Sequence, residues 1–266
     1  MKHIICYSGG HSSALVAIEV ARKYGTNDLI LLNHDINPSV EEQDIKRFKQ
    51  EVSDYLGVPI TYANHPKWNT MDQFDVSVNT KSFKGATGMA ICTSLLKTKP
   101  FNDYLKANFK DKDAILYYGF DSNELARVQR RSSILAEMGF KSDYPLALWK
   151  ERTIKSTKEI GIEPPNTYSI WKHANCTGCL KAGKQHWYLV YKNRKDIWEK
   201  AKQAEELIGY SIMKDQYLDE LEEKFDEMIK LGIETTEHED ARTFFARVRK
   251  IIKIEESDNK PCECFV

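Results

Sequence analysis

The chain of 266 residues carries 39 basic and 39 acidic side chains, so its formal net charge is zero. With 41% hydrophobic residues and a mean hydropathy of −0.54, the composition is that of a globular protein with a core of its own. This balance argues against a general nucleic-acid or membrane-surface binder but leaves room for a local basic groove. No run approaches the roughly 18 apolar residues of a membrane span, and the first ten residues lack a signal-peptide core. We therefore expect a cytoplasmic protein.

The first part of the chain alternates apolar runs with amphipathic stretches. The expected strands are 3–7, 29–33, 59–63 and 114–119, and the expected helices between and after them are 12–25, 39–56 and 123–138. Strand, helix and strand in alternation predict an α/β fold, here a doubly wound and mostly parallel sheet with right-handed crossovers.

The second part of the chain is less regular and then becomes helical. Residues 66–90 give no clear pattern, 93–108 are helical apart from Pro100, and 140–183 are predicted as loops with one short helix near 152–160. Charged amphipathic segments at 186–208, 215–231 and 239–254 predict a helical extension. We therefore divide the chain into a nucleotide-binding domain (1–183) and a helical extension with a cysteine-containing tail (184–266).

A glycine turn follows the first expected strand. Its sequence is Ser8-Gly9-Gly10-His11-Ser12-Ser13, and an apolar-periodic helix comes directly after it. The two glycines permit positive φ and close backbone approach, so that successive N–H groups can face one concavity. The helix start and the serine hydroxyls add donors, which suits phosphate or pyrophosphate. A plain Gly-Gly turn capped by serines is the alternative interpretation.

Six cysteines make a second set of candidates. Cys176-Thr177-Gly178-Cys179 is a local chelate for a metal or the edge of a cluster, and Cys92 precedes an expected helix. Cys6 lies in an apolar strand and is expected to pack as a small hydrophobic residue. The pair at 262 and 264 could serve as ligands, as a redox pair or as bystanders.

Five motifs in order resemble those of a known family. The turn at 8–13 is similar to the S-G-G-x-D-S pyrophosphate loop of the adenine nucleotide α-hydrolase superfamily (the PP-loop ATP pyrophosphatases). Later segments resemble its phosphoadenosine phosphosulfate (PAPS) reductase branch. They are Cys92-Thr93-x-x-Leu96-Lys97-x-x-Pro100, Gly119-Phe120-Asp121-x-x-Glu124-x-x-Arg127, Tyr144-Pro145-Leu146-x-x-Trp149, and Tyr168 with Cys176-Thr177-Gly178-Cys179. The resemblance spans about residues 3–190.

The resemblance implies an enzyme in which a nucleophile attacks the α-phosphate of ATP and releases pyrophosphate. The residues then expected to bind the nucleotide are Ser8, Gly9, Gly10, His11, Ser12, Ser13 and Asp35. Lys97, with Arg127 or Arg130, is expected to act on the remaining phosphate charge, and Mg²⁺ is expected on the phosphates. Asp121, like Asp35, is expected to contact a metal or the ribose. The alternative for the arginines is a solvated helix face on which Glu124 pairs with Arg127.

The same resemblance implies a metal centre. In the family, a cysteine at the place of Cys92 occurs together with a C-x-x-C at the place of Cys176 and Cys179. These three thiolates imply a [4Fe–4S] cluster whose fourth iron is open or held by Cys264, with zinc as the lesser alternative.

The chain departs from the family at three places. Ser12 stands where the loop has aspartate, and Phe120-Asp121 follows Gly119 where the family has arginine. The C-terminal residues Glu263-Cys264-Phe265-Val266 lack the glycine and histidine of the E-C-G-x-H segment of sulfonucleotide reductases. We therefore rank ATP-dependent adenylylation for sulfur or nitrogen transfer above reduction of PAPS (or its 3′-unphosphorylated analogue, APS) to sulfite. A nucleotide sensor without turnover and an iron–sulfur module are further alternatives.

A basic stretch follows the C-x-x-C. Together with the nearby Lys172, which precedes the C-x-x-C, it brings six cations among Trp and Tyr side chains: Lys172, Lys181, Lys184, Lys192, Arg194 and Lys195. Beside an activating site, such a patch suits a tRNA or DNA acceptor, whereas a helix face packed on the main domain is the simpler explanation. A homodimer is a further expectation.

Overall fold

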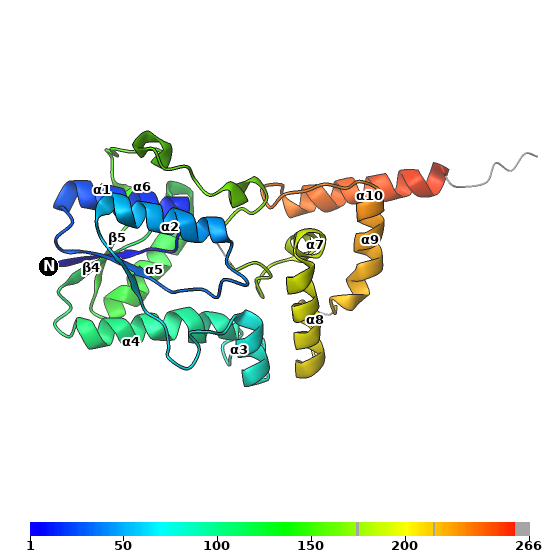
Figure 1. The fold of residues 1–266 in the computed structure, drawn as a ribbon, viewed down its shortest axis with the longest axis horizontal. Helices are drawn as coiled ribbons and strands as arrows, with labels where there is room; N and C mark the ends of the chain where they lie inside the picture. Colours follow the sequence, from blue (N-terminus) through cyan, green and yellow to red (C-terminus); the bar gives the residue numbers. More distant parts are fainter. Residues whose placement is uncertain (174–175, 215, 259–266) are drawn as a thin grey trace, which may run out of the picture.

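The computed structural model describes residues 1–173, 176–214 and 216–258, and Figure 1 traces the chain from an α/β layer into a group of helices. The strands of the described chain are β1 (Lys2–Cys6), β2 (Leu29–Asn33), β3 (Ile60–Tyr62), β4 (Ala114–Tyr117) and β5 (Lys141–Asp143). The helices of the α/β layer are α1 (His11–Tyr24), α2 (Gln43–Leu56), α3 (Gln73–Thr80), α4 (Lys99–Asn108), α5 (Leu125–Glu137) and α6 (Pro145–Leu148). The later helices are α7 (Lys184–Asn193), α8 (Lys195–Ile208), α9 (Glu222–Lys230) and α10 (Ala241–Asp258).

The five strands form one parallel sheet in the order β3-β2-β1-β4-β5. Ile4 of the central strand pairs with Ile30 on one side and with Leu116 on the other. The predicted α/β fold with a parallel sheet is therefore confirmed. Because β2 lies on one side of β1 and β4 on the other, the chain reverses its direction of winding between β1 and β4.

Alternating side chains of the strands enter two different cores. Ile5 and Leu31 pack under α1, α2 and α6, whereas Ile4, Leu32 and Leu116 pack against α4 and α5 on the opposite face. The central strands β1, β2 and β4 are thus apolar on both sides, as strands buried between two helix layers require. Figure 1 shows these helix layers above and below the sheet.

Three elements differ from the sequence-based expectation. The strand β5 was not predicted, because its sequence Lys-Ser-Asp is polar and lies half-buried at the edge of the sheet. The helix α3 falls in the stretch without a clear pattern and is started by a capping box, in which Asp72 and Asp75 bond each other's main-chain amides. The segment expected as one helix at 186–208 is two helices that meet at Arg194, which has φ −139°.

Short helical turns complete the fold. A π-helix, η1 (Thr93–Thr98), runs into α4. The 3₁₀ turns of the described chain are η2 (Ser122–Glu124), η3 (Thr157–Ile160), η4 (Asn166–Ser169) and η5 (Asp219–Leu221).

Helices α7–α10 surround an aromatic core. Trp187 and Trp198 are fully buried, and their ring centroids lie 6.2 Å apart in an edge-on arrangement. Four large side chains from earlier in the chain enter the same core: Val40, Phe74, Phe83 and Trp171. The helical region is therefore completed by residues that belong to the α/β part of the chain.

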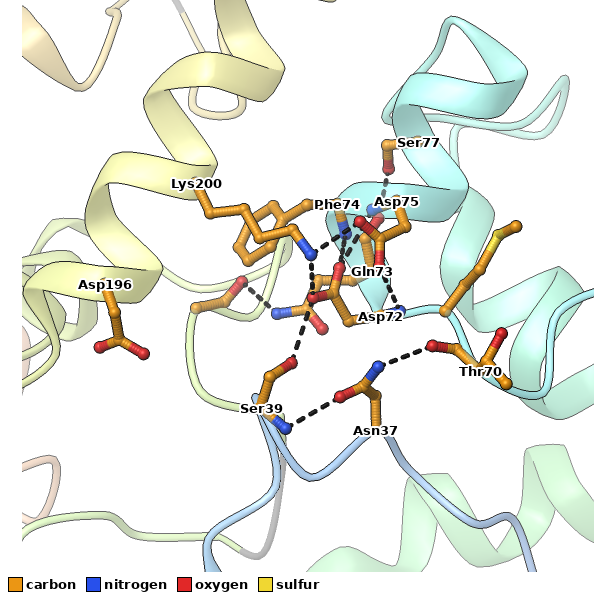
Figure 2. A network of polar contacts seen from close by, with 12 residues as sticks. Asn37, Ser39, Thr70, Asp72, Gln73, Phe74, Asp75, Ser77, Asp196 and Lys200 are labelled. Atoms are coloured by element: carbon orange, nitrogen blue, oxygen red, sulfur yellow. Dashed lines mark hydrogen bonds and ion pairs between the residues drawn. The ribbon is translucent and has the colours of Figure 1, made fainter.

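A polar network joins α3 to α8 at the seam between the two regions (Figure 2). Lys200 places its ammonium 2.6 Å from Asp72 and 2.7 Å from Asp75. The Asp72 side chain is fully buried and also accepts a hydrogen bond from Ser39 at 3.3 Å. The capping carboxylate of α3 is thus the anchor for a lysine of the helical region.

No helix in the described residues combines the length and the apolar character needed to cross a membrane.

Candidate functional site

The turn between β1 and α1 depends on glycine. Gly9 has φ +84°, a conformation that is strained for any residue with a side chain. A Cβ atom on Gly9 would lie only 2.5 Å from Cδ of Lys49, whose stem covers the turn from α2. Gly10 is the N-cap of α1 with extended backbone, and its carbonyl accepts a hydrogen bond from Ser13 Oγ at 2.8 Å.

The main-chain amides of residues 9–13 are mostly unpaired. The His11 N–H donates to the hydroxyl of Tyr168 at 3.0 Å. Within the described residues, the other four amides of this segment have no acceptor. No side chain caps α1, and its first turn carries no acidic residue. Unpaired N–H groups at the positive end of a helix form a site for an anion.

The polar side chains of the turn are partly committed. Ser8 Oγ lies 3.3 Å from Ser13 Oγ, and Ser12 is exposed at the start of α1. The ring of His11 turns back to accept a hydrogen bond from the Thr157 amide at 3.2 Å through Nε2. Burial lowers the pKa of His11, so its ring is neutral at pH 7. This histidine therefore adds no cationic charge to the turn.

The turn lies at the reversal point of the sheet. Gly119 follows β4, and a Cβ atom there would lie 2.9 Å from the carbonyl carbon of Ser12 and 3.0 Å from the amide nitrogen of Ser13. The nearest atoms are main chain, so nothing larger than glycine fits without moving the turn. Open parallel sheets bind ligands at the carboxyl ends of strands where the winding reverses.

The expected arginines and Asp121 follow Gly119 along the chain, Asp121 as the N-cap of η2 and the arginines in α5. Asp121 accepts a hydrogen bond from the Ser122 amide at 2.6 Å and so acts as a cap for η2. Arg127 pairs with Glu124 and lies 4.3 Å from the ring centroid of Phe120. Arg130 is exposed on the same helix. No hydrogen bond or ion pair of the described chain joins these residues to the glycine turn.

A charged cluster lies against the turn and was not predicted from the sequence. The ammonium of Lys49 bonds both oxygens of Glu41, at 2.9 and 3.0 Å, and both side chains are almost fully buried. Lys46 lies 3.2 Å from Glu41 and 2.8 Å from Asp35, one of the expected nucleotide-binding residues. Two lysines and two carboxylates therefore balance one another next to Gly9.

Three cysteines and Lys97 lie close enough to influence one another electrostatically, and Glu41 of this cluster influences Lys97 as well. Burial raises the pKa of Cys92 to about 11, and the neighbouring Cys176 and Cys179 act in the same direction. The pKa of Lys97 is raised, first by its electrostatic interaction with Cys176. Because each group affects the others, the structure brings together the residues of two separate sequence motifs.

The metal centre expected from the cysteines is a separate question. Among the described residues, no three or more Cys, His, Asp or Glu side chains are arranged so that they could hold one metal ion. Cys264, the fourth expected ligand, and Cys262 lie outside the described residues. The cluster or zinc site therefore stays a prediction.

The C-x-x-C turn is fixed by residues of the α/β part. Gln73 donates to the carbonyls of Thr177 and Gly178, at 2.8 and 3.2 Å. The Thr177 amide donates to the Val40 carbonyl at 2.8 Å. Gly178 has φ +74°, and a Cβ atom there would lie 2.6 Å from Ile197 of α8.

A buried histidine holds the same turn from the helical side. Nε2 of His186 accepts hydrogen bonds from the amides of Gly178 and Cys179, at 3.1 and 3.3 Å. Its Nδ1 therefore carries the hydrogen and donates it to Glu237. Burial opposes ionisation of Glu237, but the hydrogen bonds that it accepts from His186 and from the Lys172 amide outweigh this and lower its pKa. The ring of His186 thus orients both amides.

A cleft of about 400 Å³ lies beside the cysteine turn and extends to α2. Ile45, which also contacts the glycine turn, and Thr167, next to Tyr168, line one part of it. Cys176, Cys179 and His186 line another part. A molecule in this cleft would therefore lie against the cysteine turn and α2.

Sequence reasoning missed Glu41, Lys49, Gln73, His186 and Glu237. His186 and Glu237 are separated by 51 residues, and Gln73 and Thr177 by 104. Only Glu41 had a usable signal, because it follows the second strand at the edge where ligands bind.

No family model matches this sequence, and comparison with curated proteins and with solved structures gave no match.

Proposed function

We propose that the chain belongs to the adenine nucleotide α-hydrolase superfamily and binds ATP at residues 8–13. The observation that carries the proposal is the set of unpaired amides at a positive-φ glycine, at the reversal point of a parallel sheet. A polyanion supplies the acceptors that these amides lack. The closely packed Gly9 and Gly119 support it, since each position excludes a Cβ atom.

The reaction we propose is adenylylation of an acceptor. A nucleophile of the acceptor attacks the α-phosphorus of ATP, and the bond to the oxygen that bridges the α- and β-phosphates breaks. That oxygen leaves with its electron pair as part of pyrophosphate, and the acceptor carries the AMP. The protein's task is to receive the pyrophosphate and stabilise its charge, which amides fixed in advance perform without reorganisation. Sulfur or nitrogen transfer would follow at the activated acceptor.

Charged side chains around the turn would serve the same step. Lys97 interacts electrostatically with Cys176 and Cys179, which line the cleft. Arg127 and Arg130 lie on α5, which follows Gly119 in the chain. Arginine can bond two phosphate oxygens at once, provided that Arg127 exchanges Glu124 for the ligand. Mg²⁺ would arrive with the nucleotide and neutralise its phosphates.

Tyr168 marks where a phosphate oxygen would lie. Its hydroxyl oxygen accepts the His11 amide, which makes it a stand-in for an anionic acceptor. Nucleotide binding would replace this oxygen with a stronger, charged acceptor.

A substitution at Gly10 tests the proposal. Gly10→Asp introduces a carboxylate into the ring of amides and should weaken ATP binding at least tenfold by charge repulsion. Gly10→Ala is the matched control, because φ −84° is allowed for alanine. Isothermal titration with ATP and Mg²⁺ measures the affinity, and exchange of labelled pyrophosphate into ATP measures the reaction. Equal ATP affinity in Gly10→Asp and in the unmodified chain would reject the nucleotide site.

Sulfonucleotide reduction is the second candidate, and the gathering of Cys92, Cys176 and Cys179 around Lys97 favours it. Sulfite released from PAPS in the presence of a thiol reductant, with no pyrophosphate from ATP, would select it over adenylylation. Tight ATP binding without either product would select a nucleotide sensor.

The same cysteines carry the proposed metal centre. Thiolates bind an iron–sulfur cluster or zinc, and Cys92, Cys176 and Cys179 would hold it. The His186 bonds to the Gly178 and Cys179 amides would keep the C-x-x-C turn in shape around it. Iron and zinc content after anaerobic purification tests this, and the pair of changes Cys176→Ser and Cys179→Ser should remove the metal. Metal retained in that variant would place the ligands elsewhere.

A further inference from the structure

Two hollows lie against one short segment of the chain, residues 181–184, which follows the C-x-x-C turn and leads into α7. The first is the cleft of about 400 Å³ beside the cysteines. The second has a volume of about 440 Å³ and is lined by Phe83, Lys84 and Ile212 among others. Both hollows include residues 181–184 in their lining, so this segment is a ridge between them.

The ridge and its surroundings carry unbalanced positive charge. Lys181 and Lys184 line both hollows, Lys172 lines the first and Lys84 the second, and all four are exposed. Within the described residues, none of the four has an ion pair with a carboxylate. Among the residues that the structure describes, Lys184 bonds only the neutral amide of Gln216. The lining of these hollows therefore attracts anions.

The carboxylates near the ridge are already engaged. Glu42 accepts hydrogen bonds from Thr177 and Arg194, at 3.0 and 3.1 Å. Glu237 is bonded to His186 and accepts the Lys172 amide at 2.9 Å. In the described lining of the second hollow there is no acidic residue. These carboxylates therefore do not neutralise the lysines of the ridge.

Aromatic surface accompanies the charge. Trp171, His173 and Phe245 line the first hollow, and Phe83 lines the second. His173 is exposed and Phe245 is partly exposed, so a planar group can contact them. Lysines beside aromatic rings in a concave surface are the combination that binds unpaired nucleotides, through phosphate contacts and stacking.

We propose that a single strand of nucleic acid lies across the ridge at residues 181–184. Its phosphates contact Lys172, Lys181, Lys184 and Lys84, and one of its bases enters the first hollow beside Cys176 and Cys179. Two hollows on either side of a lysine-bearing ridge fit a chain of repeated phosphates, whereas one small anion needs only one hollow. As the identity of the acceptor, this rests on the proposed function; strand binding itself requires no ATP.

The test measures the binding of short fluorescent oligo-dT and oligo-U strands to the full chain by anisotropy, without ATP. Affinity should fall as salt rises, since binding releases the counterions of the phosphates. The double variant Lys172→Ala with Lys181→Ala should bind at least tenfold more weakly. It should also lower the slope of log affinity against log salt by about 1.4, because each phosphate contact of a single strand contributes about 0.7. Tighter binding of oligo-dT or of oligo-U shows whether the site prefers deoxyribose or ribose.

A matched variant removes the same charge elsewhere. Lys106→Ala with Lys110→Ala alters two exposed lysines at the end of α4 and should leave strand affinity close to that of the unmodified chain. Circular dichroism confirms that each variant is folded, and Lys172→Ala alone repeats the measurement if the double variant is not. An equal loss of strand affinity in both double variants, or no loss in Lys172→Ala with Lys181→Ala, would overturn the proposed strand-binding site.

Two further outcomes separate the proposals. Displacement of the strand by thymidine monophosphate at the same phosphate concentration would overturn the strand in favour of a small anion. The Gly10→Asp variant should keep full strand affinity while losing ATP. If strands bind as expected but ATP does not bind to the unmodified chain, the proposed adenylylation fails and the strand site stands.

Discussion

The α/β layer and the helical region use different chemical groups in their parts of the site. Around the glycine turn, the groups offered to a ligand are main-chain amides, and the decisive residues are those without a side chain, Gly9 and Gly119. Around the cysteine turn, side chains do the positioning: Gln73 from one region and His186 from the other. The first arrangement is set by local chain geometry, and the second depends on the docking of the two regions.

This difference has a consequence for how each part fails. An anion site made of main-chain amides loses its affinity when a nearby atom displaces the backbone. A turn held by side chains loses its shape when the contacts at the seam between the two regions are weakened. Substitutions at the two places should therefore separate nucleotide binding from stability, and the following predictions are ordered by the expected loss of stability.

Gly178→Ala should have the largest effect. Positive φ costs alanine about 1 kcal/mol, and the contact with Ile197 adds about 1–3 kcal/mol of overpacking. Gly209→Ala is the control, because Gly209 has φ +85° with no atom within 4 Å of a Cβ, so it isolates the cost of the backbone. Urea unfolding measures both. Similar losses of stability at the two positions would show that the contact with Ile197 is relieved without cost. A loss of ATP affinity in Gly178→Ala would show that the cysteine turn also affects nucleotide binding.

Gly119→Ala should cost about 1–3 kcal/mol of stability, because the new methyl group meets main-chain atoms of Ser12 and Ser13. Its ATP affinity should fall more than tenfold as the amides shift. Gly85→Ala is the control, since the nearest atom to its Cβ would lie at an ordinary 3.6 Å. Titration with ATP decides the outcome: unchanged affinity in Gly119→Ala would mean that the turn does not need its present shape.

These two glycines also illustrate what the sequence could predict. The strand, the Gly-Gly turn and the helix at 3–25 follow one another directly, so short-range pattern suffices for the α/β fold and for the glycine turn. The grouping of Cys92 with Cys176 and Cys179 was expected only from the resemblance between motifs, and the position of Lys97 among them was not predicted.

The seam could not be predicted, because its contacts join distant segments. Lys200 reads as one of many charged residues on an amphipathic helix, and only the fold shows that it meets the buried Asp72. Lys49 likewise belongs to a charged helix, yet it is only 1% exposed and packs on Gly9. In each case the partner lies far away in sequence or on a side of the helix that periodicity alone does not distinguish.

Lys200→Met should lower stability by about 1–2 kcal/mol. It keeps the apolar stem but leaves the fully buried Asp72 with only its amide and hydroxyl donors, and the partial exposure of Lys200 limits the loss. Lys99→Met is the matched change in the exposed pair with Asp103 and should cost less than about 0.5 kcal/mol. Equal effects in thermal unfolding would show that the seam ion pair behaves as a surface pair.

Glu237→Gln should have the smallest effect, about 1 kcal/mol or less, and it depends on pH. Because the pKa of Glu237 is lowered on folding, its ionised form stabilises the protein above the usual value of 4.5. This contribution is lost as pH falls through the lowered pKa. The difference in unfolding free energy between the unmodified chain and Glu237→Gln should therefore shrink as pH is taken below 4.5.

Glu205→Gln provides the opposite sign. Burial raises the pKa of Glu205, although the amides of Leu218 and Ile212 oppose this, so stability falls as pH rises from 4.5 through the raised pKa. The difference between the unmodified chain and this variant should change in the opposite direction over acidic pH. Urea unfolding at a series of pH values measures both curves, and parallel curves would contradict the assignment of Glu237 as a stabilising carboxylate.

The aromatic core also has a consequence for synthesis of the chain. Val40 and Phe74 leave the ribosome long before Trp187 and Phe244, the side chains that cover them in the finished fold. The first strands can pair while these early residues still face water, since domains form progressively as the chain emerges. Until α10 is synthesised, the nascent protein therefore exposes part of this hydrophobic core to water. A chain that is truncated before α10 should be prone to aggregation.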